Sequence, residues 1–284
     1  MNNKHLTFLD IIKLSVEYLE KRGVPNAKCD TEWIVSNITQ KKRVELYLNY
    51  ENMVAENHVH EIRKNIIERG KRIPLQHILG KVNFAGSELL CDQRALIPRP
   101  ETELLTELVT DELGSSFKGK ILDLGTGTGG IIITLCKNFP HAIGLGVDIS
   151  KEALSLACEN LAKNKIKNLE IKPFNWNEDE FNEKFDAIIA NPPYLSEREW
   201  ESAEPEVKIF DPKIALVAKD DGIADIKKII KISENNLVKN GLFALEIGVN
   251  QEKKIADMMS VCFYKINIIK DYCRKNRYII ARKK

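Results

Sequence analysis

The sequence predicts an α/β fold: a parallel sheet covered by helices on both faces, preceded by a small helical domain. Beyond about residue 96, apolar segments of strand length alternate with helical patterns, as in parallel-sheet proteins. One such segment leads into a glycine-rich turn and then an apolar helix, an arrangement that is typical of nucleotide-type binding loops. Residues up to about 72, in contrast, show helical periodicity alone.

The N-terminal residues 1–75 are expected to form a small helical bundle. Thr7 and Asp10 have the spacing of a capping box, and an apolar face follows them until Gly23 ends the run. Further helices are expected after Pro25 and over about residues 56–69. Nothing in this region resembles a catalytic centre.

A change of pattern marks the start of the second part of the chain. Two short mixed segments surround Gly86-Ser87, so residues 76–95 are expected to form a β-hairpin or extended linker. Residues 96–284 then form the α/β domain. Its strands are expected at 121–124, 142–147, 169–171, 185–190, 242–247, 266–269 and 278–281, with a helix behind Ser150 as its N-cap.

Composition excludes several classes of function. The 284 residues carry 43 Lys and Arg against 41 Asp and Glu, and residues 1–80 alone carry 13 against 10. Such near-balance argues against a broad basic surface for bare nucleic acid. The six cysteines form no C-x-x-C pair, so no metal site is expected, and no apolar run approaches the roughly 20 residues of a membrane span. A monomeric, cytoplasmic protein without a signal peptide or direct nucleic-acid binding is therefore expected.

The strongest local signal is a glycine loop that follows the apolar segment 121–124. Its glycines permit positive φ and let backbone N–H groups approach a ligand; the loop reads Gly125-Thr126-Gly127-Thr128-Gly129. Asp148 ends the next strand, where a carboxylate suits both ribose hydroxyls. The loop alone fits either a nicotinamide dinucleotide or S-adenosylmethionine. Asp123 favours S-adenosylmethionine, because a carboxylate there attracts its positively charged methionyl end and would repel a pyrophosphate.

A second signal ends the apolar segment 185–190: the turn Asn191-Pro192-Pro193-Tyr194. Its two prolines lack N–H donors, so the turn offers carbonyl acceptors, the Asn191 side-chain carbonyl and the Tyr194 ring. Such a site can accept both hydrogens of a planar –NH2 group and pack against its plane. Holding that nitrogen in line with a sulfonium methyl would promote methyl transfer. No general base is required, and none stands out nearby.

These two motifs together resemble the amino-directed class I, or Rossmann-like, S-adenosylmethionine-dependent methyltransferases. Two further motifs, at residues 74–80 (PLQHILG) and 96–105 (LIPRPETELL), are similar to those of PrmC/HemK-type peptide chain release factor glutamine methyltransferases. The resemblance continues through Leu245-Glu246-Ile247-Gly248 and covers nearly the whole chain. Two positions depart from the family pattern: Asn175 replaces the common Asp, and residues 271–277 lack the usual turn glycine.

The resemblance implies a function and a set of site residues. The enzyme would transfer a methyl group from S-adenosylmethionine to the side-chain nitrogen (N5) of glutamine in the Gly-Gly-Gln motif of class I release factors. The product of the cofactor would be S-adenosylhomocysteine. That modification would modulate translation termination, and the helical domain would help to grip the factor. The glycine loop, Asp148, Trp176 and Asn191 would bind the cofactor. Asn191, Pro192, Pro193 and Tyr194 would hold the substrate amide, with Asn191, Pro192 and Tyr194 as catalytic residues.

Some alternatives stay open at the level of sequence. Arg99 and Glu101 either line the substrate site or cap the helix that follows them. A ribosomal-protein glutamine methyltransferase is the nearest rival, although its family usually continues differently after Ile-Pro-Arg. An adenine N6 or guanine N2 methyltransferase acting on nucleic acid should carry a basic recognition region, which the sequence lacks. A non-catalytic binding module would keep the glycine loop without needing Asn191-Pro192-Pro193-Tyr194.

Overall fold

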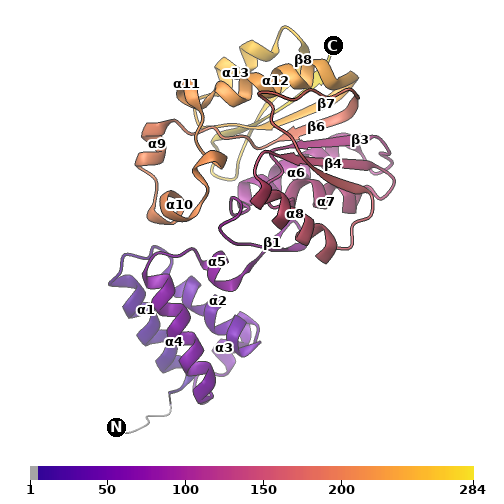
Figure 1. The fold of residues 1–284 in the computed structure, drawn as a ribbon. Coiled ribbons are helices and arrows are strands. Elements are labelled where there is room, and N and C mark those ends of the chain that lie inside the picture. Colours follow the sequence, from indigo (N-terminus) through magenta and orange to yellow (C-terminus); the bar gives the residue numbers. More distant parts are fainter. Residues whose placement is uncertain (1–5) are drawn as a thin grey trace. The chain divides into compact units, whose positions relative to one another are not determined.

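The computed structural model describes residues 6–284, and the chain forms two compact units, Met1–Gly80 and Lys81–Lys284 (Figure 1). Each unit has its own apolar core. The hairpin that we expected as a linker is part of the second unit. The functional division of the chain at residues 75 and 95 stays a prediction. Within the described residues, no helix is both long and apolar enough to cross a bilayer.

Between residues 6 and 80 the secondary structure of the first unit is helical, apart from one isolated β-bridge between Thr7 and Met53. The Thr7 hydroxyl accepts a hydrogen bond from Asp10 N (3.2 Å) and the Asp10 carboxylate accepts one from Thr7 N (3.0 Å), which confirms the predicted capping box. Two short helices, α3 and α5, were not predicted, because five or six residues are too few to show a helical period. The helices are α1 Phe8–Glu20, α2 Ala27–Thr39, α3 Arg43–Leu48, α4 Glu56–Gly70 and α5 Leu75–Leu79.

A seven-stranded sheet, in the order β5-β4-β3-β6-β7-β9-β8, forms the centre of the second unit. Its first five strands in this order are parallel, whereas β9 runs antiparallel to both of its neighbours. The strands are β3 Lys120–Leu124, β4 Ile143–Asp148, β5 Leu169–Pro173, β6 Phe185–Ala190, β7 Leu237–Glu246, β8 Phe263–Lys270 and β9 Asn276–Lys283.

The sheet is therefore parallel as predicted, except that β9 runs antiparallel near one edge. A tight turn, rather than a crossover helix, joins β8 to β9, and a turn of that length can connect only antiparallel strands. In this turn the Asp271 carboxylate accepts a hydrogen bond from Lys275 N (2.9 Å). Arg274 adopts φ +60°, so it takes the left-handed conformation without the glycine that is usual in the family.

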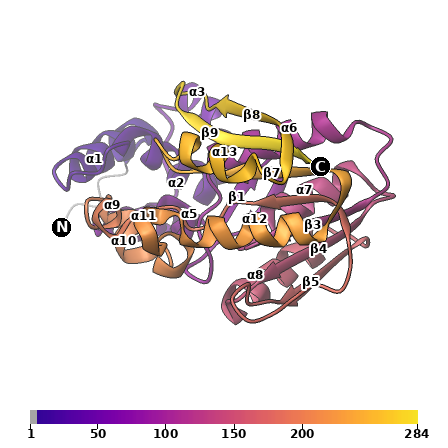
Figure 2. The same cartoon turned by 90° about the horizontal axis from the view of Figure 1, so that it is seen from above.

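Helices cover both faces of the sheet, as predicted. Apolar side chains of α6 (Pro100–Leu113), α7 (Gly130–Asn138) and α8 (Lys151–Lys163) pack on one face. Those of α12 (Ala224–Asn236) and α13 (Glu252–Met259) pack on the other, in front of the sheet in Figure 2. The α8 helix begins behind Ser150, whose hydroxyl accepts from Ala153 N (3.1 Å), so the predicted N-cap is confirmed.

Two smaller segments complete the second unit. The hairpin pairs β1 (Lys81–Phe84) with β2 (Ser87–Leu90). Between β6 and α12 the chain forms four short helical pieces that the sequence did not predict: α9 Glu197–Glu201, α10 Pro205–Phe210, η1 Lys213–Ala215 and α11 Lys219–Gly222.

One buried side chain ties the hairpin to the glycine loop. Asn160, on α8, accepts from Leu90 N (2.6 Å) and donates to Leu90 O (3.1 Å) and Thr128 O (3.0 Å). These three hydrogen bonds satisfy backbone groups of two segments that are far apart in the sequence. Asn160 therefore fixes both segments relative to the sheet.

We expect Asn160→Ala to lower the free energy of unfolding by about 1–3 kcal/mol, because it leaves buried backbone groups without partners. Urea denaturation of the full chain measures this loss. Cys158→Ala is a matched control on the same helix, since Cys158 is exposed, and should change stability by at most about 0.5 kcal/mol. An equal loss in both variants would show that the three hydrogen bonds do not stabilise the unit.

Candidate active site

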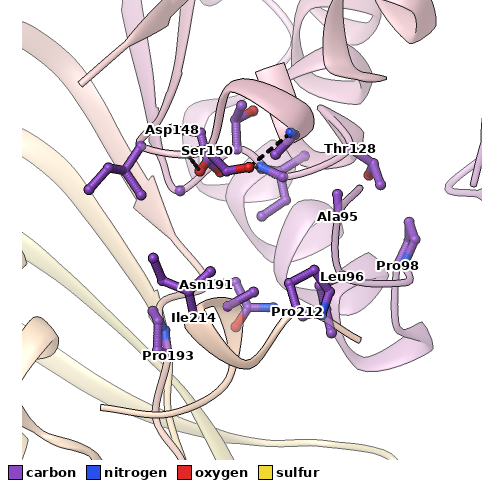
Figure 3. Close-up of a pocket in the computed structure, with 18 of the residues that line it drawn as sticks. Ala95, Leu96, Pro98, Thr128, Asp148, Ser150, Asn191, Pro193, Pro212 and Ile214 are labelled. Carbon is purple, nitrogen blue, oxygen red and sulfur yellow. Dashed lines mark hydrogen bonds between the residues drawn. The ribbon is translucent and has the colours of Figure 1, made fainter. Parts of the chain in front are cut away.

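A cleft opens where the carboxyl ends of β3, β4 and β6 meet, the position where ligands bind in open α/β sheets. About 1130 Å³ of empty space, open solvent included, lies among its lining residues. In Figure 3, Asp148 and Ser150 lie on one side of the cleft and Asn191 and Pro193 on the other. Ala95, Leu96 and Pro98 come from the segment before α6.

The glycine loop supplies backbone without side chains at the floor of the cleft. Gly125, Gly127 and Gly129 have φ of +78°, +54° and +83°. A Cβ at Gly127 would meet nothing within 4 Å, so any side chain there would occupy the open cleft. A Cβ at Gly125 would lie 3.6 Å from the Trp176 ring. Gly125 to Thr128 line the cleft, whereas Gly129, the N-cap of α7, does not.

Asp148 lies at the end of β4 and lines the cleft. Its Oδ2 accepts a hydrogen bond from Gly127 N (2.9 Å) and its Oδ1 accepts from Ser150 N (3.0 Å). Burial raises the pKa of this carboxyl, although the backbone hydrogen bonds oppose the rise. Each oxygen keeps a further lone pair, so the carboxylate can also accept the two ribose hydroxyls for which it was predicted.

Trp176, which was predicted to bind the cofactor, lies beside the glycine loop. Its Nε1 donates to Asp225 Oδ1 (3.0 Å), and both residues line the cleft. Asn175, which replaces the family's Asp, instead accepts from Asn177 N (3.0 Å) through its Oδ1. Sequence reasoning missed Asp225, because it lies in the first turn of α12, far along the chain and outside any motif.

Asp123 does not reach the cleft. It is fully buried in β3, and its Oδ2 accepts a hydrogen bond from Thr126 Oγ1 (2.7 Å). Burial, reinforced by the nearby Asp148, raises the pKa of this carboxyl to about 7. We expected Asp123 to face the methionyl end of the cofactor; the structure instead places it beneath the loop, where it orients Thr126.

The turn after β6 divides its four residues between the cleft and the interior. Asn191 and Pro193 line the cleft, whereas Pro192 and Tyr194 do not. Asn191 Nδ2 donates to Thr102 Oγ1 (3.0 Å). The Tyr194 hydroxyl donates to Glu246 Oε1 (3.1 Å), and burial raises its pKa. The interior hydrogen bond of Tyr194 therefore anchors the turn, and the turn presents the Asn191 amide to the cleft.

Glu246 is the site residue that sequence reasoning missed most clearly. It ends β7, is fully buried, and accepts from Thr102 Oγ1 at its Oε2 (2.8 Å). Burial raises the pKa of this carboxyl to about 7. The signal was present, because Glu246 follows an apolar strand as Asp148 does, yet the sequence indicated no titratable group near the turn.

Arg99 and Glu101 have different places. Arg99 lines the cleft and forms an ion pair with Asp211, which also accepts from Ile97 N (3.4 Å). Glu101 lies in the first turn of α6 and does not line the cleft; its backbone carbonyl accepts from the Tyr278 hydroxyl (2.7 Å). The structure thus brings Arg99 to the cleft and leaves Glu101 at the helix terminus.

The site as a whole fits S-adenosylmethionine. A glycine-rich loop, a carboxylate for the ribose and an aromatic ring lie around one cleft, and an amide acceptor faces it from the opposite side. Among residues 6–284, no cluster of three or more His, Cys, Asp or Glu side chains could hold a metal ion.

Comparisons with known sequences agree along most of the chain. Residues 10–80 match the family model of the PrmC N-terminal domain, and residues 100–208 match that of the methyltransferase small domain. A release factor glutamine methyltransferase of Fusobacterium nucleatum is 38% identical over 280 residues, which span 97% of this chain and 78% of that protein. One of Thermodesulfovibrio yellowstonii is 35% identical over 261 residues, or 89% and 92% of the two chains.

Solved structures share the fold at low sequence identity. The 16S rRNA N2 G1207 methyltransferase of T. thermophilus, in complex with AdoMet and guanosine, has a TM-score of 0.53 and 19% identity over 72% of this chain and 50% of its own. A methyltransferase of Pyrococcus furiosus has a TM-score of 0.52 and 16% identity over 70% and 89%. The predicted class I methyltransferase fold is confirmed.

We expect Asp148→Asn to weaken binding of S-adenosylhomocysteine by about tenfold or more, because it replaces a charged acceptor with a single neutral carbonyl. Isothermal titration calorimetry of the full chain measures the dissociation constant. Glu170→Gln makes the same acid-to-amide change on the exposed side of the neighbouring β5 and should leave it unchanged. Equal affinities of the Asp148 variant and the wild type would exclude the ribose contact.

Proposed function

The chain belongs to the family of release factor glutamine methyltransferases, and from that premise we propose the reaction it performs. It transfers a methyl group from S-adenosylmethionine to the side-chain nitrogen (N5) of glutamine in the Gly-Gly-Gln motif of class I peptide release factors. It is thus a protein-(glutamine-N5) methyltransferase that modulates translation termination. The observation that carries the proposal is the Asn191 amide, which faces the cleft opposite the glycine loop.

Asn191 can hold the substrate amide through its oxygen. Because its Nδ2 donates to Thr102, its Oδ1 is the side-chain atom that can accept from a substrate –NH2 group. For the second acceptor we propose the backbone carbonyl of Pro192, which lies in the turn between the cleft-lining residues Asn191 and Pro193, while Tyr194 packs against the apolar core. Two acceptors fit the two hydrogens of a primary amide and leave its nitrogen facing the cleft.

These contacts address the weak nucleophilicity of an amide. Its nitrogen lone pair is delocalised toward the carbonyl. When two oxygen atoms accept hydrogen bonds from both N–H groups, charge density returns to the nitrogen. S-adenosylmethionine supplies, when bound, a methyl group on a positively charged sulfur. The chain contributes orientation: Asp148 and the glycine loop fix one reactant and Asn191 the other, so that the methyl and the nitrogen meet in line.

Binding of a whole release factor requires contacts outside the cleft. We propose that the N-terminal helical unit helps to bind the release factor, that the protein acts as a monomer in the cytoplasm, and that it binds no nucleic acid directly. The near-neutral charge of residues 1–80 supports a protein partner over a nucleic-acid one.

We expect the protein to label a class I release factor with methyl groups from labelled S-adenosylmethionine and not to label its Gly-Gly-Gln variant with Gln→Ala. Scintillation counting of the purified factors measures the transfer, and mass spectrometry of the tryptic peptide locates the methyl group. Ribosomal protein and ribosomal RNA are included as competing acceptors. Equal labelling of both factors, or labelling of ribosomal protein or RNA instead, would exclude the proposed substrate.

We further expect Asn191→Ala to lower kcat by about 10²-fold, the typical cost of removing one preorganised hydrogen-bonding group. Binding of S-adenosylhomocysteine should survive in part, because the glycine loop and Asp148 are unchanged. Steady-state kinetics and calorimetry separate the two effects. Full activity in this variant would remove the proposed role of Asn191.

A further inference from the structure

We infer that Glu246 is a positioning residue for methyl transfer: it acts through the Thr102 hydroxyl to fix which way the Asn191 amide points. The inference rests on the proposed function, since it explains how Asn191 presents an acceptor to the substrate. Glu246 does not line the cleft, and Thr102 stands between it and Asn191. Its effect on the reaction is therefore indirect.

A continuous chain of hydrogen bonds connects the three residues. Thr102 Oγ1 lies 2.8 Å from Glu246 Oε2 and 3.0 Å from Asn191 Nδ2. Glu246 and Thr102 are both buried, and each of the three residues comes from a different element: the end of β7, the first turn of α6 and the turn after β6. Because water is largely excluded, the direction of each hydrogen bond is set by these partners.

The direction follows from a count of hydrogens. A threonine hydroxyl has one hydrogen, and a carboxylate can only accept, so Thr102 donates its hydrogen to Glu246. Thr102 can then only accept from Asn191, which must turn its –NH2 toward Thr102 and its Oδ1 away. If the hydroxyl were free to donate to Asn191, the amide could rotate and turn its –NH2 toward the substrate. Two –NH2 groups would then face each other.

Tyr194 holds the other oxygen of the same carboxylate. Its hydroxyl donates to Glu246 Oε1 (3.1 Å), so both carboxylate oxygens accept from hydroxyl groups. A neutral carboxylic acid, or a glutamine, offers only one acceptor oxygen and presents a donor at the other position. One of the two hydroxyls would then lose or reverse its hydrogen bond. Only the ionised carboxylate satisfies both, which makes charge at Glu246 part of the arrangement.

Several groups around Glu246 bear on that charge. Arg277 on β9 favours the ionised form, whereas Glu101 on α6 opposes it. The Tyr194 hydroxyl and the Tyr278 hydroxyl, also on β9, stay neutral because burial and Glu246 raise their pKa values. Burial outweighs the hydrogen bonds from Thr102 and Tyr194 and the charge of Arg277, and it raises the Glu246 pKa to about 7, above its ordinary value. The carboxyl thus becomes protonated as pH falls through about 7.

The test compares Glu246→Gln with the wild-type enzyme on a release factor. We expect kcat at pH 8 to fall by about tenfold, while the dissociation constant of S-adenosylhomocysteine stays within about twofold. The wild-type kcat should fall as pH is lowered through about 7, and the variant should lack that limb because glutamine does not titrate. A structural role alone would not remove a limb of the pH profile.

A double-mutant cycle identifies the residue through which Glu246 acts. Adding Glu246→Gln to Asn191→Ala should produce no further loss of kcat, because the amide that Glu246 positions is already absent. A second series covers the case in which Glu246→Gln fails to fold: Thr102→Val removes the hydroxyl at constant shape and should slow turnover, and Thr102→Ser should restore most of the rate. Thr106→Val is the matched control: it removes a buried hydroxyl one turn along α6 that donates to the Thr102 backbone carbonyl (3.1 Å) and not to the Thr102 hydroxyl, and it should keep the wild-type kcat.

The outcomes separate this inference from the proposed function. No transfer to the release factor by the wild-type enzyme would overturn both. Transfer by the wild type, with an unchanged kcat in Glu246→Gln or in Thr102→Val, would overturn the inference alone. Fully additive losses in the cycle would do the same, since they would mean that Glu246 and Asn191 act independently.

Discussion

The site depends on the register of four parallel strands. Leu124 of β3 pairs with Val147 of β4 and with Ala190 of β6, and Ala190 pairs with Leu245 of β7. The residue that follows each of these four therefore lies in one row along the edge of the sheet: Asp148, Gly125, Asn191 and Glu246. If any one strand shifted by one residue, an apolar neighbour would take the place of its residue in this row, or that residue would point to the other face of the sheet. The backbone hydrogen bonds of the sheet thus place the cofactor side and the substrate side of the cleft before any side chain contributes.

Three carboxyls with raised pKa values lie at or near this row, and they have two uses. Asp148 accepts hydrogen bonds from backbone N–H groups and faces the cleft. Asp123 and Glu246 accept hydrogen bonds from hydroxyl groups and face the protein interior. Burying a carboxylate is costly, and the raised pKa values of all three report that cost. The core supplies the stability that offsets it. Asp148 and Glu246, which accept hydrogen bonds at both oxygens, can then hold neighbouring groups in one orientation, which a solvated acid cannot do.

The sequence was sufficient for features that one strand or one turn determines. The glycine loop, Asp148 and the turn that begins at Asn191 follow strands with an unmistakable apolar pattern, and Thr7 and Ser150 cap their helices as predicted. It was insufficient where partners come from distant elements. Asp225 reaches Trp176 from α12, and Glu246 reaches Thr102 across 144 positions of the chain. No local pattern records such pairings, because they depend on which helix packs against which strand.

Strand geometry explains why the Asp123 side chain lies away from the cleft, where we did not expect it. Its position just before the glycine loop suggested a side chain that faces the ligand, yet alternation along β3 decides its direction. Ile121 and Asp123 lie on the face that α6 and α7 cover, and Leu122 and Leu124 lie on the other. Asp123 is therefore turned into the protein by the period of the strand, and the nearest group it can accept from is the Thr126 hydroxyl. Glu246 also lies inside the protein, but Thr102 extends its reach to Asn191. A buried acid beside a cleft can thus influence the ligand through a hydroxyl that it orients, and the hydrogen count of that hydroxyl decides which atom the ligand meets.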